Sequence, residues 1–141
     1  MNAYFETSAL VKLLTREDGW DLADALWGAS DLLITSRLTY VEVRAALAAG
    51  GRGRRFGASL LATAKASFEE RLDSMEVVEA SAGVVAEAAD LAERHALRGY
   101  DAVHLASALA YGSAETTFAT WDRGLASAAR ARSLDVAGIA V

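Results

Sequence analysis

Short apolar stretches alternate with longer segments of helical periodicity along most of this chain. The first stretch, residues 3–5, is apolar and aromatic, as suits a buried strand, and Leu10, Leu13 and Leu14 then recur at helical spacing. Strands that are separated by helices pair in parallel, because a parallel return needs a long crossover connection. The alternation therefore predicts the α/β class, an α/β sandwich around a central parallel sheet of four to five strands.

Glycine residues and polar breaks divide the chain into its expected elements, since proline is absent. Further strands are expected at residues 31–35, 75–78 and 116–120, with a last one at 136–141. Further helices are expected at residues 20–28, 37–49, 56–72, 81–95, 100–111 and 121–132. Gly50 and Gly51 are expected to end the helix of residues 37–49, and the Thr35-Ser36 hydroxyls are placed to cap its start.

Length and composition limit the classes of protein to which the chain can belong. A chain of 141 residues, 53% hydrophobic and 23% charged, is expected to form one domain over residues 1–141. It has no cysteine and two histidines, which argues against disulfides and a structural zinc site. No apolar run approaches the ~20 residues of a membrane helix, so we expect a cytoplasmic protein without a membrane partner. The net charge of −5 weighs mildly against a polyanionic substrate, unless a bound cation cancels an acidic cluster.

Four acids stand where the predicted sheet would bring them together. Glu6 and Asp122 each follow a strand, Asp101 opens a helix, and Glu42 lies inside the helix of residues 37–49 without a basic partner one turn away. Each has an ordinary explanation: a favourable helix dipole for Glu6, a solvated helix face for Glu42, and an N-cap for each Asp. Together they point to one edge of a parallel sheet, where they would repel one another unless a cation joined them. Oxygen ligands of this kind suit Mg²⁺ or Mn²⁺.

Four stretches of the chain carry a resemblance to a known family. They are YFETSALVKLL, TSRLTYVEVRAAL, LRGYDAVHLASAL and FATWDRGLASAAR, and together they cover nearly the whole chain. In this order and at this spacing, the sequence resembles the PIN-domain ribonucleases, in particular the VapC-type toxins of bacterial toxin–antitoxin pairs.

The resemblance implies a Rossmann-like three-layer α/β/α sandwich and a metal-dependent endoribonuclease with Mg²⁺ or Mn²⁺ as cofactor. It also implies an RNA substrate, a cognate VapB-type antitoxin and a homodimer. Glu6, Glu42, Asp101 and Asp122 occupy the family's acidic positions, and Ser8 occupies the hydroxyl position beside the first acid. The hypothesis is that Glu6, Asp101 and Asp122 hold one or two cations, with Glu42 ligating a second ion or orienting a water. Ser8 would bind a carboxylate or a metal-bound water, or else cap the first helix together with Thr7.

Glu6 departs from the family pattern, which has Asp at this position. The longer side chain displaces the carboxylate by roughly a bond length, and Mg²⁺ demands near-ideal octahedral geometry. A slow natural enzyme, a preference for Mn²⁺ and an engineered attenuation all agree with the sequence. So does an inactive module that binds RNA or the antitoxin without cutting. A phosphatase with an aspartyl nucleophile is disfavoured, because it needs two Asp where this chain has Glu6 and Ser8.

A basic cluster and a histidine close to Asp101 also bear on the expected site. Arg52, Arg54 and Arg55 form the only dense basic cluster and are candidates for RNA contacts, with a solvated loop and antitoxin contacts as alternatives. His104 lies one turn after Asp101, and we expect it to be a helix-face histidine without a catalytic role, since the resemblance assigns it none.

Overall fold

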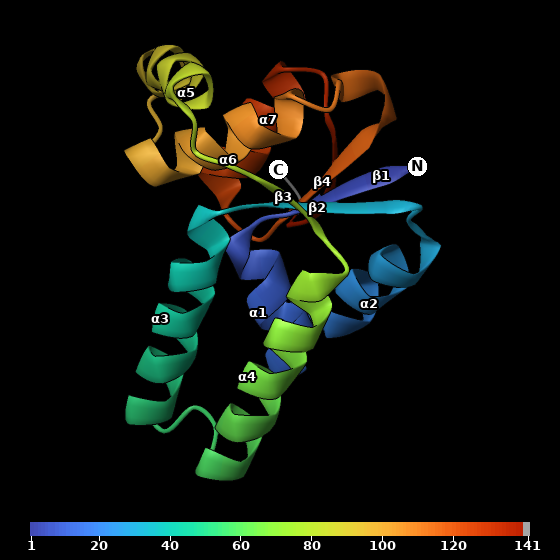
Figure 1. Cartoon of the computed structure of the whole chain (residues 1–141), viewed down its shortest axis with the longest axis vertical. Coiled ribbons are helices and arrows are strands. Elements are labelled where there is room, and N and C mark those ends of the chain that lie inside the picture. The colour runs from blue at the N-terminus through green and yellow to red at the C-terminus, as the bar shows by residue number, and fades with distance from the viewer. Residues whose placement is uncertain (140–141) are drawn as a thin grey trace.

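A five-stranded parallel sheet forms the centre of the computed structural model of this chain, which describes residues 1–139 (Figure 1). The strands are β1 (Asn2–Phe5), β2 (Leu32–Ser36), β3 (Glu76–Val78), β4 (Thr116–Thr120) and β5 (Asp135–Gly138). They lie in the order β3-β2-β1-β4-β5, and every neighbouring pair is parallel. The predicted α/β class and strand number are confirmed.

Helices cover both faces of the sheet and complete the predicted three layers (Figure 1). They are α1 (Thr7–Thr15), α2 (Trp20–Ala29), α3 (Leu38–Arg52), α4 (Ala58–Asp73), α5 (Ala82–His95), α6 (Gly99–Leu109) and α7 (Arg123–Ala131), with a 3-10 turn, η1 (Ser113–Glu115), before β4. The first four helices lie on one face, and α5 to α7 lie on the other (Figure 1).

The central strand β1 contributes to both hydrophobic cores. Ala3 and Phe5 face the core beneath α1 to α4, whereas Tyr4 faces the core beneath α5 to α7. All three side chains are fully buried. Tyr4 is paired in register with Ile34 on one side and Phe118 on the other, and its ring stacks on Phe118 with 5.2 Å between centroids. An apolar run without alternation is what a parallel strand covered on both faces requires.

The strand order reverses direction between β1 and β4. From β1 the chain builds outward through β2 to β3, and it then crosses to the other side of β1 to place β4 and β5. Ligands of open α/β sheets bind at the carboxyl ends of the strands where such a reversal occurs. Glu6 and Asp122 follow these two strands, so the topology brings them to one place.

The helix α3 ends later than the sequence predicts. It continues through Gly50 and Gly51 to Arg52. Gly50 is buried, and a Cβ there would overlap the ring of Phe56. The glycine therefore admits an aromatic ring against the helix instead of ending it.

Two smaller predictions about element ends differ from the structure in detail. The N-cap residue of α3 is Arg37, whose side chain makes no capping hydrogen bond, although the Ser36 hydroxyl before it accepts from the backbone N–H of Leu38 at 3.1 Å. The last strand begins at Asp135 and ends at Gly138, short of the predicted 136–141, and the final two residues of that range lie outside the described part.

Among the described residues, no helix is both long and apolar enough to cross a membrane.

Candidate active site

A pocket of about 380 Å³ opens where β1 and β4 end. Its wall is built from the turn after β1, the helices α1, α3 and α6, and the turn before α7. The lining residues are Glu6, Thr7, Ser8, Val11, Lys12, Glu17, Glu42, Ala46, Arg55, Arg98, Asp101 and Asp122. The four acids of the sequence analysis therefore share one pocket.

Glu6 is the most enclosed of the four acids, with 5% of its surface exposed. It follows β1 and caps α1, accepting a hydrogen bond from the backbone N–H of Ser8 at 2.9 Å. The Ser8 hydroxyl donates to the same carboxylate, and so does the Thr120 hydroxyl, at 3.0 Å. Burial raises the pKa of Glu6 above its ordinary value, and these hydrogen bonds only partly oppose it.

Ser8 joins the start of α1 to the end of β4. Its hydroxyl donates to Glu6 and accepts a hydrogen bond from the backbone N–H of Trp121 at 2.8 Å. The cap of α1 is Glu6, so the alternative in which Ser8 and Thr7 cap that helix is wrong. The contact between Ser8 and the first acid is the one that the sequence analysis considered.

Arg98 connects the two aspartates of the pocket. Its Nε donates to Asp101 at 2.8 Å and its Nη2 to Asp122 at 3.4 Å. These two carboxylates hold the pKa of Arg98 above its usual value, and Asp101 contributes the larger effect. Asp122 caps α7 by accepting from the backbone N–H of Leu125. Asp101 is not a cap, because α6 begins after Arg98 and Asp101 lies in its first turn.

Glu42 projects from α3 and is held by two side chains from other elements. His104 Nε2 lies 2.6 Å from its Oε1, and the Thr7 hydroxyl donates to the same oxygen at 2.8 Å. Burial by itself would raise the pKa of Glu42, but these hydrogen bonds outweigh it and the pKa is lowered. Glu42 is therefore a half-buried carboxylate and not the solvated helix residue of the ordinary explanation.

The sequence profile of the PIN domain family matches residues 3–131 of this chain. The chain belongs to the PIN domain family. It stands among the VapC-type members, since "Ribonuclease VapC45" of Mycobacterium tuberculosis is 50% identical to it over 134 residues, which are 95% of this chain and 93% of that protein.

Solved structures share the fold of this chain. The crystal structure of Mycobacterium tuberculosis VapC20, described as a sarcin-ricin loop cleaving toxin, matches 89% of this chain and 94% of its own, with a TM-score of 0.65 and 20% identity. A toxin–antitoxin complex from Klebsiella pneumoniae matches 85% of this chain and 86% of its own, with a TM-score of 0.61 and 18% identity. At these identities the two structures support the fold alone.

The carboxylates of this PIN domain have the right chemistry for a hard divalent cation, although they are not gathered into a complete ligand set. Within residues 1–139, no three acidic or histidine side chains are arranged as a metal centre. Asp101 and Asp122 are directed to Arg98, while Glu6 is directed to hydroxyl and amide donors. The atoms that these three carboxylates would offer to a metal ion are nevertheless all oxygen. Glu6 is also buried, and an ionised carboxylate at that depth is costly unless a cation or hydrogen bonds compensate it.

The three arginines of the basic cluster have different surroundings. Arg55 lines the pocket and donates to Glu17 at 2.6 Å. Arg52 and Arg54 are exposed, and neither belongs to the pocket lining. The structure thus brings one of the three predicted RNA-contact residues to the acids.

Several residues of the site were missed by the sequence analysis. Thr120 and Arg98 bind the predicted acids, and His104 binds Glu42 in place of lying on an unused helix face. The available signal for Arg98 and His104 was their spacing, one turn before and one turn after Asp101. For Thr120, the signal was its position at the end of a predicted strand, as for Glu6.

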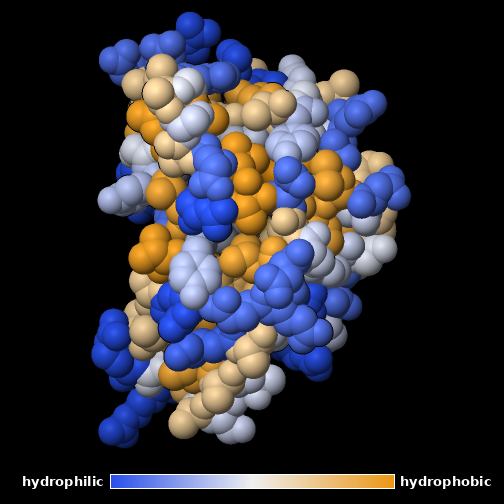
Figure 2. All heavy atoms as spheres, viewed as in Figure 1, coloured by the Kyte–Doolittle hydropathy of each residue, from blue (hydrophilic) through white to orange (hydrophobic). Residues whose placement is uncertain are grey.

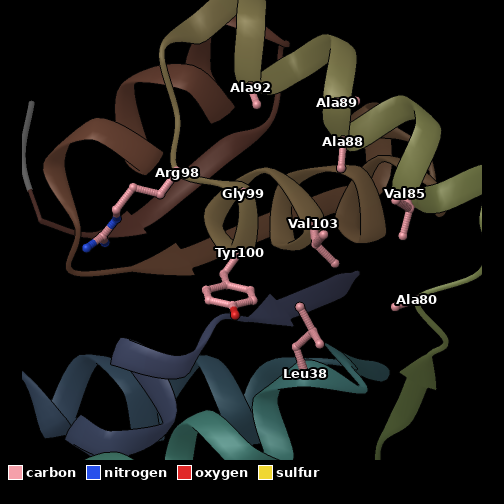
Figure 3. Close-up of a pocket in the computed structure, with 10 residues that line it drawn as sticks. All are labelled: Leu38, Ala80, Val85, Ala88, Ala89, Ala92, Arg98, Gly99, Tyr100 and Val103. Atoms are coloured by element: carbon pink, nitrogen blue, oxygen red, sulfur yellow. The ribbon is translucent and has the colours of Figure 1, made fainter.

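An apolar groove of about 700 Å³ lies beside the acidic pocket, and Arg98 lines both. Figure 3 shows Tyr100 and Val103 of α6 directed toward Leu38 of α3, while Arg98 extends away from the alanine-rich wall on α5. The hydropathy-coloured surface shows apolar side chains gathered in the middle of the molecular face seen in Figure 1 (Figure 2).

Proposed function

We propose that this chain is a metal-dependent endoribonuclease that acts as the toxin of a toxin–antitoxin pair. The observation that carries the proposal is the shared pocket: Glu6, Glu42, Asp101 and Asp122 come from four separate sequence stretches and line it together. The 50% identity to a protein named as a ribonuclease supports the nuclease class. It also favours an active enzyme over a binding module that does not cut.

Glu6, Asp101 and Asp122 would hold Mg²⁺ or Mn²⁺. When bound, such a cation lowers the pKa of a water and offsets the charge that develops on a phosphate. Ser8 and Thr120 keep the Glu6 carboxylate at the pocket floor through their hydroxyl groups. Glu42 would orient the water that attacks the phosphodiester, since its pKa keeps it ionised and ready to accept a hydrogen bond.

Basic residues at the rim would receive the RNA backbone. Lys12, Arg55 and Arg98 line the pocket, and Arg52 and Arg54 are exposed nearby in sequence. Guanidinium groups match the geometry of phosphates, and such contacts position a nucleic acid without reading its sequence. Cleavage is therefore expected to weaken with increasing salt.

The test is cleavage of a mixed pool of transfer and ribosomal RNA by the purified protein in Mg²⁺, in Mn²⁺ and in EDTA. Glu6→Asp and Asp101→Ala are compared with the wild type, and circular dichroism shows that each is folded. We expect metal-dependent cutting that disappears in Asp101→Ala and increases in Glu6→Asp, where the shorter side chain restores the family's usual ligand. Failure of every folded variant to cut in either metal would overturn the nuclease proposal.

We also propose a small cognate antitoxin of the VapB type as the partner, and pairing of two copies of the chain. The toxin–antitoxin complex from Klebsiella pneumoniae, whose fold is similar, supports the first of these. Co-expression with the neighbouring reading frame, followed by mass measurement in solution, is the experiment. A monomeric toxin and the lack of a stable complex would each contradict the corresponding part.

A further inference from the structure

A chain of hydrogen bonds runs from the buried core of the sheet to the acidic pocket. The Tyr4 hydroxyl lies 2.7 Å from His104 Nδ1, and His104 Nε2 lies 2.6 Å from Glu42 Oε1. Tyr4 is fully buried and His104 is 1% exposed. Three elements far apart in sequence, β1, α3 and α6, are thus joined through one imidazole ring.

For a neutral imidazole, the chemistry of the three groups selects one arrangement of hydrogens. An ionised Glu42 only accepts hydrogen bonds, so His104 Nε2 carries the hydrogen between them. In the neutral ring Nδ1 is then an acceptor, and the Tyr4 hydroxyl must be its donor. Tyr4 is fully buried, and its hydroxyl lies 2.7 Å from Nδ1, within reach for that hydrogen bond.

The hydrogen bonds to Glu42 also distinguish its two oxygens. His104 and Thr7 both bind Oε1, and no side chain among residues 1–139 donates to Oε2. The carboxylate is therefore held through Oε1, while Oε2 carries no hydrogen bond from these side chains. A carboxylate on a flexible Glu side chain needs such support to act in a defined direction.

We propose that His104, oriented by Tyr4, is a positioning residue that holds Glu42 for the cleavage reaction. This inference rests on the proposed function, because it concerns how one acid of the nuclease site is aimed. It assigns a role to a histidine that is not itself part of the pocket lining and that reaches the pocket through Glu42 and Thr7, which lies 3.4 Å from its Nε2.

The first test does not depend on catalysis. The chain has two histidines, His95 and His104, so ¹⁵N-detected NMR of the imidazole nitrogens gives a simple spectrum that His104→Gln assigns. We expect His104 to be the Nε2–H tautomer in the wild type, with a shift of its Nδ1 signal in Tyr4→Phe. Tyr40→Phe is the matched control, since it removes a hydroxyl that binds Glu69 on the surface. An Nδ1–H tautomer, or a spectrum unchanged by Tyr4→Phe, would overturn the proposal.

The second test asks whether the pair acts through Glu42. Tyr4→Phe should lower kcat for RNA cleavage about two- to tenfold, the loss expected for one hydrogen bond, with KM unchanged. In a Glu42→Gln background, Tyr4→Phe should not lower kcat any further, because there is no ionised acid left to position. Equal losses in both backgrounds would contradict the coupling.

Substitutions of His104 separate positioning from packing. His104→Gln can still donate to Glu42 from its amide nitrogen, whereas His104→Leu fills the space without a donor. We expect His104→Leu to lose about 10- to 100-fold in kcat and His104→Gln to recover most of it. Equal activity of the two variants, both shown to be folded, would mean that the ring only fills space. If the wild type cleaves no RNA, the proposed function fails, and the NMR measurements still decide the geometry.

Discussion

The Thr120 hydroxyl donates a hydrogen bond of 3.0 Å to the carboxylate of Glu6, although 114 positions separate the two residues. The same hydroxyl accepts a hydrogen bond from the backbone N–H of Asp122 at 3.0 Å. Thr120 therefore connects the first and the last acid of the site through one oxygen atom. The pairing of β1 with β4 brings the two strand ends together.

Replacement of Thr120 tests this connection. Thr120→Val keeps the shape of the side chain but removes the hydroxyl, which leaves a buried carboxylate with one donor fewer. We expect the free energy of unfolding to fall by about 1–3 kcal/mol, as measured by urea denaturation. Thr120→Ser is the matched control, since it keeps the hydroxyl and should lose less. Equal stability of Thr120→Val and the wild type would show that the hydrogen bond contributes nothing.

Glu6 should make stability depend on pH in a direction opposite to that of a typical carboxyl group. Its pKa is raised in the folded state, so the unfolded chain ionises first as the pH increases. The wild type should therefore lose stability relative to Glu6→Gln as the pH rises from about 4 through the folded pKa. Urea denaturation in EDTA between pH 4 and 7 measures this difference. A difference that grows in favour of the wild type with rising pH would contradict the shift.

The bridge from Arg98 to the aspartates should oppose metal binding. Arg98→Gln removes a cation that Asp101 and Asp122 now share, so these carboxylates become free to bind another. We expect the Kd for Mn²⁺, measured by isothermal titration calorimetry, to fall about two- to fivefold, the range of an exposed ion pair. Arg94→Gln, which changes an arginine lining a different pocket, should leave the Kd unchanged. Weaker Mn²⁺ binding in Arg98→Gln would instead make the guanidinium a supporting part of the site.

Replacement by alanine at two helical glycines should change the stability of the protein in opposite directions. Gly28 is exposed in α2, and a Cβ there meets nothing within 4 Å, so Gly28→Ala should stabilise by about 0.5–1 kcal/mol. Gly50 in α3 faces the ring of Phe56, so Gly50→Ala should destabilise by about 1–3 kcal/mol through overpacking. Thermal unfolding of both variants checks the pair. A stabilised Gly50→Ala would show that α3 and Phe56 separate at little cost.

The sequence by itself determined the α/β fold and the place of two of the acids at the carboxyl edge of the sheet. Continuous apolar strands between amphipathic helices allow little besides a parallel sheet covered on both faces, and such a sheet collects the residues that follow its strands. Glu6 and Asp122 were predictable for that reason. Glu42 and Asp101 were named because the stretches around them resemble those of a known family.

Only the tertiary structure decided which partner each acid has. Glu42 of α3 meets His104 of α6 although these two helices lie on opposite faces of the sheet (Figure 1). Arg98 reaches Asp122 as well as Asp101 because α7 begins beside α6. Sequence periodicity gives the face of a helix on which a residue lies. It does not give the rotation and distance of the neighbouring element, and hydrogen bonds depend on both to within a few tenths of an ångström. The same limit explains α3, where Gly50 indicates a helix end in the sequence but receives the ring of Phe56 in the structure.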